Sequence, residues 1–355
     1  MKLIHTADLH LGAQNTAKLP LHLAERRREE LLSTFADIAA LAEREGAAVL
    51  VAGDLFDTTP PQDRALSAFL DTVRHFSGVR FFCLPGNHDG GRFPEVSLPE
   101  NLTVFRGACD RISVGDTDIF GISPEGEFPY DALCPDRARK NIVLAHGTVR
   151  EGGTPAEGVI VLSHLAGRGI DYLALGHFHS MRIGRLDERG VYAYSGTPEG
   201  RGMDEAGECG VLLIDTDTTP VEPRFIKTAR RTVHRLTVDL TLGEGDLFST
   251  VREIEAATLG IPEGDIVRVE LVGKLPPEAP RPAVLRIEER FSGRFFHFEV
   301  KDKTGTAIRA EDFADSLSLK GEFVRRVLSC DLSPEEQDTV LRMGLAALRG
   351  EGDEI

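Results

Sequence analysis

Short apolar runs of strand length recur through the first half of this 355-residue chain, and helical patterns separate the early ones. The expected strands are Lys2–Thr6, Ala47–Val51, Val79–Leu84, Asn141–Ala145 and Asp171–Leu175. Apolar residues recur with helical spacing over Leu23–Arg44 and Asp63–Phe76, between the first three strands. This alternation of strands and helices predicts an α/β fold, in which helices cover a sheet.

Two later segments have the pattern of antiparallel hairpins. The paired runs are Arg111–Val114 with Thr117–Ile122 across Gly115-Asp116, and Met181–Asp187 with Val191–Ser195 across Arg189-Gly190. We therefore expect a mixed sheet rather than a purely parallel one. A last apolar strand, Val211–Ile214, is expected to close the first domain near residue 228.

The pattern of elements starts again beyond residue 228, which predicts three domains: 1–228, a small α+β domain at 229–305, and C-terminal helices at 306–355. The α+β domain is expected to contain strands Thr232–Leu240, Ile266–Val272 and Arg294–Lys301, helices Asp246–Leu259 and Ala283–Arg290, and a proline-rich turn at 276–282. In the tail, Ser333 as N-cap and Pro334 as first helical residue predict the start of a helix.

Acidic residues outnumber basic ones, 57 Asp and Glu against 41 Lys and Arg, for a formal charge of −16. The surface as a whole therefore cannot be a basic nucleic-acid-binding face, and any phosphate site must be local. The five cysteines are scattered without a Cys-x-x-Cys pair, which favours a reducing compartment. Without a signal-peptide core or a run of about 18 apolar residues, we expect a soluble, cytoplasmic protein that does not enter a membrane.

Residues able to bind metal ions directly follow the five expected strands. In strand order they are Asp8 and His10; Asp54; Asn87, His88 and Asp89; His146; and His177 and His179. In open α/β sheets the loops beyond the carboxyl ends of the strands converge on one crevice, so these side chains are expected to meet. A helix cap or a turn would explain any one cluster alone, but not all five in this order.

This set combines carboxylate, amide and imidazole groups, which suits manganese, iron or zinc. The absence of thiolates among them argues against a structural zinc site. A carboxylate shared by two ions about 3.5–4 Å apart can orient phosphate and generate a hydroxide nucleophile, so a two-metal site is compatible with this set. Glycines precede Asp54, Asn87 and His177, as expected where a tight turn must bring a ligand inward.

The ordered motifs D-x-H, G-D, G-N-H-D, H and G-H-x-H, spread over roughly residues 1–215, resemble the signature of the calcineurin-like metallophosphoesterases. Within that superfamily the chain is similar to the SbcD-type and YhaO-like branch of DNA repair exonuclease subunits. The segments that carry this similarity are His5–Gly12, Ala52–Asp57, Leu84–Asp89 and Ser195–Arg201. The resemblance implies a sandwich of mixed β-sheets in four layers, α/β/β/α, with a smaller α+β capping domain and C-terminal helices.

The resemblance also implies roles for single residues. Asp8, His10, Asp54 and His179 would hold one Mn²⁺ ion, and Asp54, Asn87, His146 and His177 a second one. His88 would stabilise the transition state or protonate the leaving oxygen. Asp89 would orient a ligand imidazole through its other nitrogen, and Asp57 would be peripheral.

The activity implied is that of a metal-dependent DNA nuclease in double-strand break repair or end processing, a 3′–5′ exonuclease and single-strand endonuclease. Its implied partners are DNA and an SbcC-like, SMC-type ATPase that docks on the C-terminal helices, and a homodimer is compatible. Candidate phosphate contacts are Arg92, Arg150, Arg182 and Arg201. The run Arg26-Arg27-Arg28 is expected instead to form a solvated helix face.

Two other functions remain open at this point. The ligand set alone would also serve another phosphodiesterase or phosphatase of the same fold, acting on a small molecule or a phosphoprotein. The second alternative is a non-catalytic subunit that scaffolds DNA ends and keeps a vestigial metal site.

Overall fold

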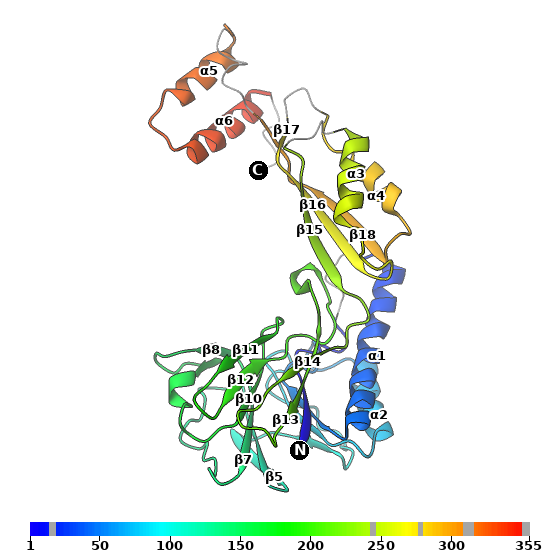
Figure 1. Ribbon diagram of the computed structural model, residues 1–355, viewed down its shortest axis with the longest axis vertical. Coiled ribbons are helices and arrows are strands. Elements are labelled where there is room, and N and C mark those ends of the chain that lie inside the picture. The colour runs from blue at the N-terminus through cyan, green and yellow to red at the C-terminus, as the bar shows by residue number, and fades with distance from the viewer. Residues whose placement is uncertain (14–18, 242–245, 276–279, 308–315, 350–355) are drawn as a thin grey trace. The chain divides into compact units, whose positions relative to one another are not determined.

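The computed structural model describes residues 1–13, 19–241, 246–275, 280–307 and 316–349. The chain divides into two compact units, Met1–His234 and Arg235–Ile355 (Figure 1). No helix in these described ranges is long and apolar enough to cross a lipid bilayer.

The first unit contains a six-stranded sheet of order β14-β13-β1-β2-β3-β4. Its strands are β1 (Lys2–Thr6), β2 (Ala48–Ala52), β3 (Phe81–Leu84), β4 (Leu102–Val104), β13 (Gly210–Asp215) and β14 (Arg224–Lys227). β1 to β4 run parallel, so the loops after β1, β2 and β3 leave from the same edge. β13 pairs antiparallel with both β1 and β14, which makes the sheet mixed.

A second six-stranded sheet has the order β11-β12-β10-β7-β6-β5. Its strands are β5 (Cys109–Val114), β6 (Thr117–Ile122), β7 (Lys140–His146), β10 (Tyr172–Gly176), β11 (Arg182–Arg185) and β12 (Val191–Tyr194). The four central strands are parallel, and β5 and β11 pair antiparallel at the two edges. The expected mixed α/β fold and both expected hairpins are therefore confirmed.

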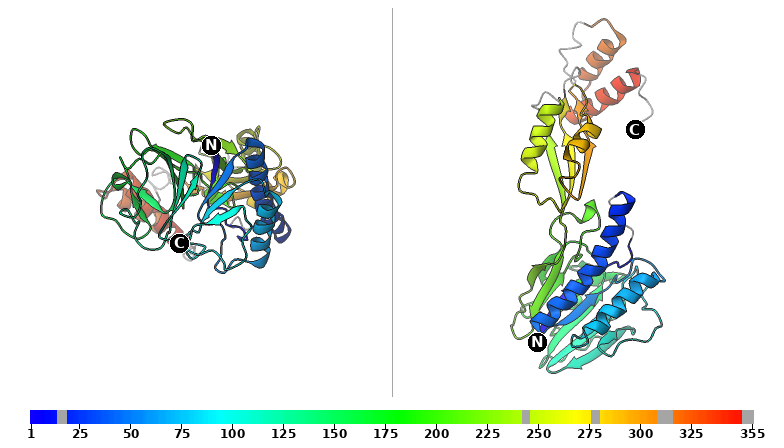
Figure 2. Two further views of the ribbon diagram at one scale, coloured as in Figure 1. Left: turned by 90° about the horizontal axis from the view of Figure 1, so that it is seen from below. Right: turned by 90° about the vertical axis from the view of Figure 1, so that its right-hand side faces the viewer.

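Alternating side chains of the strands divide the first unit into layers. In β2, for example, Leu50 packs in the cluster between the two sheets, whereas Val49 and Val51 pack against helices. Those helices are α1 (Leu21–Glu45) and α2 (Asp63–His75), which lie across the outer face of the first sheet (Figure 2). The parallel strands are buried on both faces, which explains their continuous apolar sequences.

The outer face of the second sheet is covered by residues 123–139 and by the segment 147–170. This segment contains strands β8 (Thr148–Arg150) and β9 (Val159–Val161) and the 3-10 helix η1 (Leu162–His164). Leu162 and Leu165 of this cover pack on Leu173 of β10. Among the described residues, the helical part of this outer layer is thus the single short turn η1.

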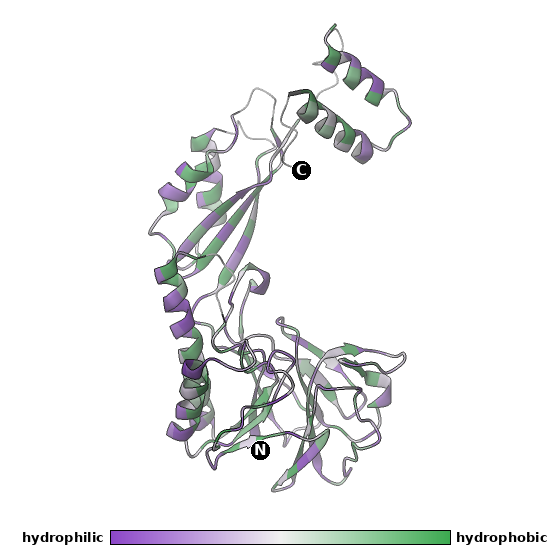
Figure 3. Cartoon of the chain, turned by 180° about the vertical axis from the view of Figure 1, so that it is seen from behind, coloured by the Kyte–Doolittle hydropathy of each residue, from purple (hydrophilic) through white to green (hydrophobic). Residues whose placement is uncertain are grey.

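The second unit is an α+β structure with a three-stranded sheet of order β15-β16-β18. Its elements are β15 (Val233–Asp239), α3 (Leu247–Ala257), β16 (Ile266–Val272), β17 (Lys274–Leu275), α4 (Val284–Phe291), β18 (His297–Asp302), β19 (Gly305–Thr306), α5 (Leu319–Leu328) and α6 (Pro334–Arg349). The three sheet strands show alternating hydrophobic and hydrophilic bands (Figure 3), because only one face packs on α3 and α4. The N-cap of α6 is confirmed, since the main-chain N–H of Glu336 donates to Oγ of Ser333 at 3.4 Å. Residues 276–279 of the expected proline-rich turn lie outside the described residues.

Several elements differ from the sequence predictions. Strands β4, β8 and β9 are not expected from the sequence, because three residues are too few to show a period-2 pattern. Strand β14 extends the first sheet just before residue 228 and has no buried residue to signal it. The solvated face expected for the arginine run is wrong for Arg27, which is 1% exposed and ion-pairs with Glu199 and Glu30.

One buried polar contact joins the two sheets across the apolar layer between them. Nδ1 of His5 in β1 lies 2.8 Å from the hydroxyl of Tyr172 in β10, and both side chains are fully buried. Burial lowers the pKa of His5 to about 3, so its imidazole is neutral. The contact therefore satisfies a polar group that water cannot reach.

We expect Tyr172→Phe to lower the free energy of unfolding by about 1–3 kcal/mol, because His5 then keeps a buried nitrogen without a partner. Urea denaturation measures this change. Tyr192→Phe is the control, since the hydroxyl of this buried tyrosine makes no hydrogen bond to the described residues. An equal loss in both variants would mean that the His5 contact contributes nothing specific.

Candidate metal centre

The loops after the parallel strands hold their polar residues in a rare backbone conformation. Four non-glycine residues of the described chain have positive φ: Asp8 (52°), His10 (43°), Asp54 (51°) and His177 (101°). All four belong to the predicted ligand set, and such conformations cost of order 1–3 kcal/mol each. Hydrogen bonds join the loop after β1 to the loop after β2. The main-chain N–H of Asp8 donates to the carbonyl of Gly53, and that of His10 donates to the carbonyl of Asp54, each at 3.0 Å.

Three glycines leave the space that this arrangement needs. A Cβ on Gly53 would lie 2.1 Å from Nδ1 of His146, and one on Gly86 would lie 2.2 Å from Oδ1 of Asp54. A Cβ on Gly176 would lie 2.0 Å from the carbonyl oxygen of Ala52. Only Gly53 of the three has positive φ, so close approach rather than turn geometry is the requirement at Gly86 and Gly176.

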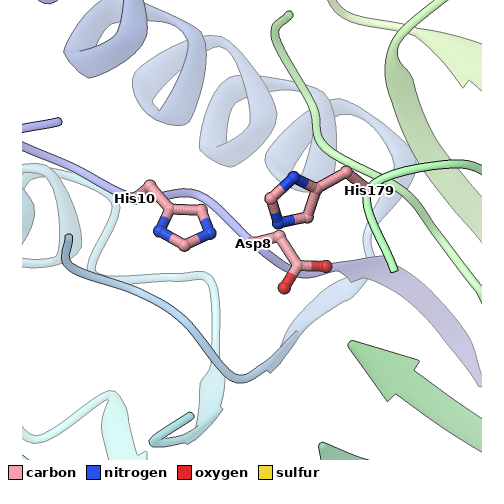
Figure 4. A group of neighbouring side chains, drawn as sticks. All are labelled: Asp8, His10 and His179. Atoms are coloured by element: carbon pink, nitrogen blue, oxygen red, sulfur yellow. The ribbon is translucent and has the colours of Figure 1, made fainter. Parts of the chain in front are cut away.

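The predicted ligands do gather at one place. Asp8, His10 and His179 point toward one another (Figure 4), and Asp8 also forms a group with Asp54 and His146. Within each of these groups the potential ligand atoms lie within 4.8 Å of one another. The five residues come from three loops and from the end of β7, and they are up to 171 positions apart in the chain (from 8 to 179).

Asp54 lies at the centre of the arrangement. Its Oδ2 is 3.3 Å from Nε2 of His146 and 3.7 Å from Nε2 of His10. Nε2 of His146 also lies 2.9 Å from Oδ1 of Asn87, while its Nδ1 lies 2.9 Å from the carbonyl oxygen of Ala52. Nδ1 donates to the Ala52 carbonyl, and Nε2 faces the oxygens of Asp54 and Asn87, where a bound ion would replace its proton. Although burial by itself would lower it, hydrogen bonding and charge from Asp54 raise the pKa of His146 to about 9.

The cluster has the character of a cation site. Nε2 of His10 is buried and has no hydrogen-bond partner among the described residues. The Asp8 carboxylate is 1% exposed and accepts hydrogen bonds of 2.9 and 3.1 Å from the main-chain N–H of His177. Buried anions and unpartnered imidazole nitrogens that converge on one point suit a divalent metal ion.

The two central carboxylates have pKa values shifted in opposite directions. Burial raises the pKa of Asp8 to about 6. Burial acts in the same direction on Asp54, but hydrogen bonding and charge from His146, with His10, lower the pKa of Asp54 to about 2. Asp54 is therefore the more acidic of the two, and Asp8 is the carboxylate whose ionised form a bound cation would stabilise more.

Three of the predicted residues lie on the open side of the cluster: Asn87, His88 and His177 are exposed. The His88 ring lies edge-on to His10 with centroids 4.8 Å apart, and the His88 main-chain N–H donates to Oδ1 of Asp54 at 2.9 Å. The His177 ring lies 5.4 Å from that of His146, centroid to centroid. These side chains can meet a ligand that arrives from solvent.

The expected role of Asp89 is not what the structure shows. Its carboxylate accepts three main-chain hydrogen bonds, from Leu55, Phe56 and Gly86, at 3.0, 2.8 and 2.8 Å. Asp89 therefore ties the Asp54 loop to the Gly86 loop and does not orient an imidazole. Asp57, expected to be peripheral, is the residue whose Oδ1 lies 3.3 Å from Nδ1 of His10.

The four candidate phosphate contacts lie in different surroundings. Arg150 lines a cavity of about 370 Å³ together with Asn87, His146 and His177, so it borders the cluster. The guanidinium of Arg92, 83% exposed, lies 3.6 Å from Glu125, and Arg182 is exposed on edge strand β11. Arg201 is the correction: its side chain is only 10% exposed and is engaged by acidic side chains.

Those acidic side chains include one that sequence reasoning missed, Glu205. It lies at the end of the 3-10 helix η2 (Met203–Glu205), and its Oε1 is 2.6 Å from Nη2 of Arg201 and 2.8 Å from Nδ1 of His179. Although burial by itself would raise it, hydrogen bonds from His179 and Arg201 lower the pKa of Glu205 to about 2. No strand precedes Glu205, so the rule that located the other residues could not find it.

Comparison with known proteins gives one family and several relatives. The model of the calcineurin-like phosphoesterases matches residues 1–181, which include the whole cluster from Asp8 to His179. The chain is 24% identical over 299 residues to a DNA double-strand break repair protein Mre11 from Sulfolobus acidocaldarius, with 78% of this chain and 76% of that protein covered. It is 27% identical over 306 residues to the uncharacterized metallophosphoesterase YhaO of Bacillus subtilis, with 78% and 74% covered. A shorter match, 29% identical over 93 residues, is to a protein of Staphylococcus epidermidis named as a subunit of the nuclease SbcCD, with 25% and 23% covered.

We expect Gly86→Ala to weaken Mn²⁺ binding at least ~10-fold, because the new methyl group displaces the Asp54 carboxylate. Titration calorimetry of the purified protein with Mn²⁺ measures the affinity. Gly78→Ala is the matched control, since nothing lies within 4 Å of a Cβ built there. Unchanged affinity in Gly86→Ala would show that Asp54 is not a ligand.

We also expect Mn²⁺ affinity to fall more steeply once the pH drops below about 6. The raised pKa of Asp8, about 6, means that this carboxylate is protonated below that pH, and a protonated carboxyl group competes with metal binding. His146, with its pKa raised to about 9, must also lose a proton to bind metal, and this lowers the affinity at all three pH values used. Calorimetric titrations at pH 7.5, 6.0 and 5.0 test this, and a fall that is no steeper between pH 6.0 and 5.0 than between 7.5 and 6.0 contradicts the assignment of Asp8.

Proposed function

The chain belongs to the calcineurin-like phosphoesterase family, and from that premise we propose that it is a metal-dependent nuclease that hydrolyses phosphodiester bonds in DNA. The observation that carries the proposal is the convergence of Asp8, Asp54 and their neighbouring histidines on one partly open site. A relative named for DNA double-strand break repair, similar over 78% of this chain, supports DNA as the substrate.

In this proposal the cluster holds two divalent ions, with Mn²⁺ as the metal. The first set of ligands would be Asp8, His10, Asp54 and His179, and the second Asp54, Asn87, His146 and His177. When bound, such ions polarise a phosphodiester and make water a stronger nucleophile at neutral pH. The central place of Asp54, near both His10 and His146, supports its role as the shared ligand.

The protein's own residues would then handle the substrate. His88 would donate a proton to the leaving 3′ oxygen or a hydrogen bond to the phosphate, since its exposed imidazole lies beside His10 and its main chain is held by Asp54. Arg150 would attract a neighbouring phosphate from the cavity that borders Asn87. Local positive groups of this kind allow phosphate binding in spite of the net charge of −16.

We propose further that the protein acts in double-strand break repair or end processing, as a 3′–5′ exonuclease and single-strand endonuclease in the cytoplasm. An SMC-type, SbcC-like ATPase would dock on α5 and α6, whose exposed Leu319, Val340 and Met343 form apolar positions on the described helix surfaces. A relative named as a subunit of the nuclease SbcCD supports such a complex. A homodimer is also compatible with this proposal.

We expect His88→Ala to reduce DNA hydrolysis by about 10²–10⁴-fold, the range typical of a lost general acid, while the bound metal stays near wild type. End-labelled duplex and single-stranded DNA, each assayed in Mn²⁺ and in Mg²⁺, measure the rate, and elemental analysis measures the metal. His164→Ala is the control, because this exposed histidine packs on Tyr130, away from the cluster.

The same assays separate the alternatives. Wild-type protein that cleaves a chromogenic phosphodiester but no DNA would favour a phosphodiesterase or phosphatase with another substrate. Protein that binds DNA ends and metal without hydrolysing either substrate would favour the scaffolding function. Full activity in His88→Ala would contradict the role given to His88.

A further inference from the structure

Two histidines of the cluster have the same second contact. Nδ1 of His10 lies 3.3 Å from Oδ1 of Asp57, and Nδ1 of His179 lies 2.8 Å from Oε1 of Glu205. The Nε2 atoms are thus left as the nitrogens available to a ligand in the site. A carboxylate at Nδ1 favours the tautomer with a hydrogen there and fixes the plane of the ring.

Arg201 connects these two carboxylates. Its Nη1 lies 3.5 Å from the same Oδ1 of Asp57, and its Nη2 lies 2.6 Å from the same Oε1 of Glu205. Each carboxylate oxygen therefore lies within ion-pair distance of one imidazole Nδ1 and one guanidinium nitrogen, and the guanidinium also donates hydrogen bonds to Glu205. We call Asp57, Arg201 and Glu205 the carboxylate bridge.

Arg201 and Glu205 of the bridge are firmly held and largely shielded from water, whereas the side chain of Asp57 is 27% exposed. The side chains of Arg201 and Glu205 are 10% and 2% exposed, and the main-chain N–H of Arg201 donates to Oε2 of Glu205 at 2.6 Å. The preceding residue is fixed as well, since the buried Arg27 of α1 donates to the carbonyl oxygen of Gly200 at 2.6 Å. Ion pairs held in this way lose little entropy on forming and keep a defined geometry.

The charge of Arg201 has a second effect. Asp57 forms a potential metal-binding group with His10 and His88, so an unpaired carboxylate there would compete for the cation. Pairing with a guanidinium keeps the carboxylates of Asp57 and Glu205 directed at the Nδ1 side of the two imidazoles. The two histidines are thereby left to present Nε2 to the ion.

We propose that Arg201 and Glu205 are positioning residues of the metal centre: through direct contact with His179, and through Asp57 with His10, they set the orientation of two ligand imidazoles. This inference rests on the proposed metal site, but not on DNA being the substrate. It gives Arg201 a role in metal affinity in place of the phosphate contact expected from the sequence.

The test uses two conservative variants of the full chain, Glu205→Gln and Arg201→Lys. Both carboxylate oxygens of Glu205 accept hydrogen bonds from Arg201, so the NH₂ group of Glu205→Gln places a donor opposite a donor in either orientation of the amide. In Arg201→Lys, a single ammonium group cannot reach both carboxylates. We expect each to weaken Mn²⁺ binding by about 10–100-fold and to change the visible absorption spectrum of bound Co²⁺. Asp118→Asn is the matched control: this carboxylate is fully buried and paired with Arg111 and Arg139 at the start of β6.

Calorimetry with Mn²⁺, Co²⁺ spectra and thermal unfolding of the metal-free proteins give the readouts. The inference would be overturned if both variants kept the Mn²⁺ affinity and Co²⁺ spectrum of the wild type, or if Asp118→Asn lost as much affinity as they do. A loss of affinity in Glu205→Gln alone would show that Arg201 is not a positioning residue. A wild-type protein that binds neither ion would refute both the metal site and the bridge. A wild-type protein that binds metal, shows the expected losses in the variants and cleaves no DNA would refute only the nuclease proposal.

Discussion

The burial of two carboxylates, Asp8 and Asp54, within one cluster is the constraint on which the rest of the first unit depends. Two anions in a site nearly closed to water repel each other and are poorly solvated. The structure offsets this cost with imidazoles on Asp54 and with a main-chain N–H on Asp8. The residual imbalance is large enough to raise the pKa of Asp8, which is the electrostatic reason why the site suits a cation.

The sandwich of two mixed sheets is what brings these groups together. In each sheet the loops that follow the parallel strands lie at the carboxyl ends of those strands. Because the two sheets pack on each other through an apolar layer, these two groups of loops lie close together. Residues of the first sheet, such as Asp54, can then contact His146 at the end of a strand in the second. The strained backbone of the ligand residues is stable only because paired main-chain hydrogen bonds between loops hold it.

The parts of the site that could be predicted are those with a local signature. A polar residue directly after an apolar strand is visible in the sequence, and this rule is sufficient to locate Asp8, Asp54 and His146. Glu205 and Asp57 follow no such rule, because their roles depend on which loop folds over which imidazole. The sequence misplaces Arg27 for a related reason: its burial is due to Glu199, 172 residues away in the chain (from 27 to 199). Side chains whose partners lie far along the chain have no periodicity that would indicate them.

The three glycines of the cluster carry a consequence for how such proteins can diverge. Many ligand positions allow exchange, since aspartate, asparagine and histidine can replace one another around a metal at some loss of affinity. Gly53, Gly86 and Gly176 allow exchange only if the site itself shifts, because even a methyl group would occupy space already filled by His146, Asp54 or the Ala52 carbonyl. Over long evolutionary times, the most invariant positions of this centre should therefore be residues without any functional group.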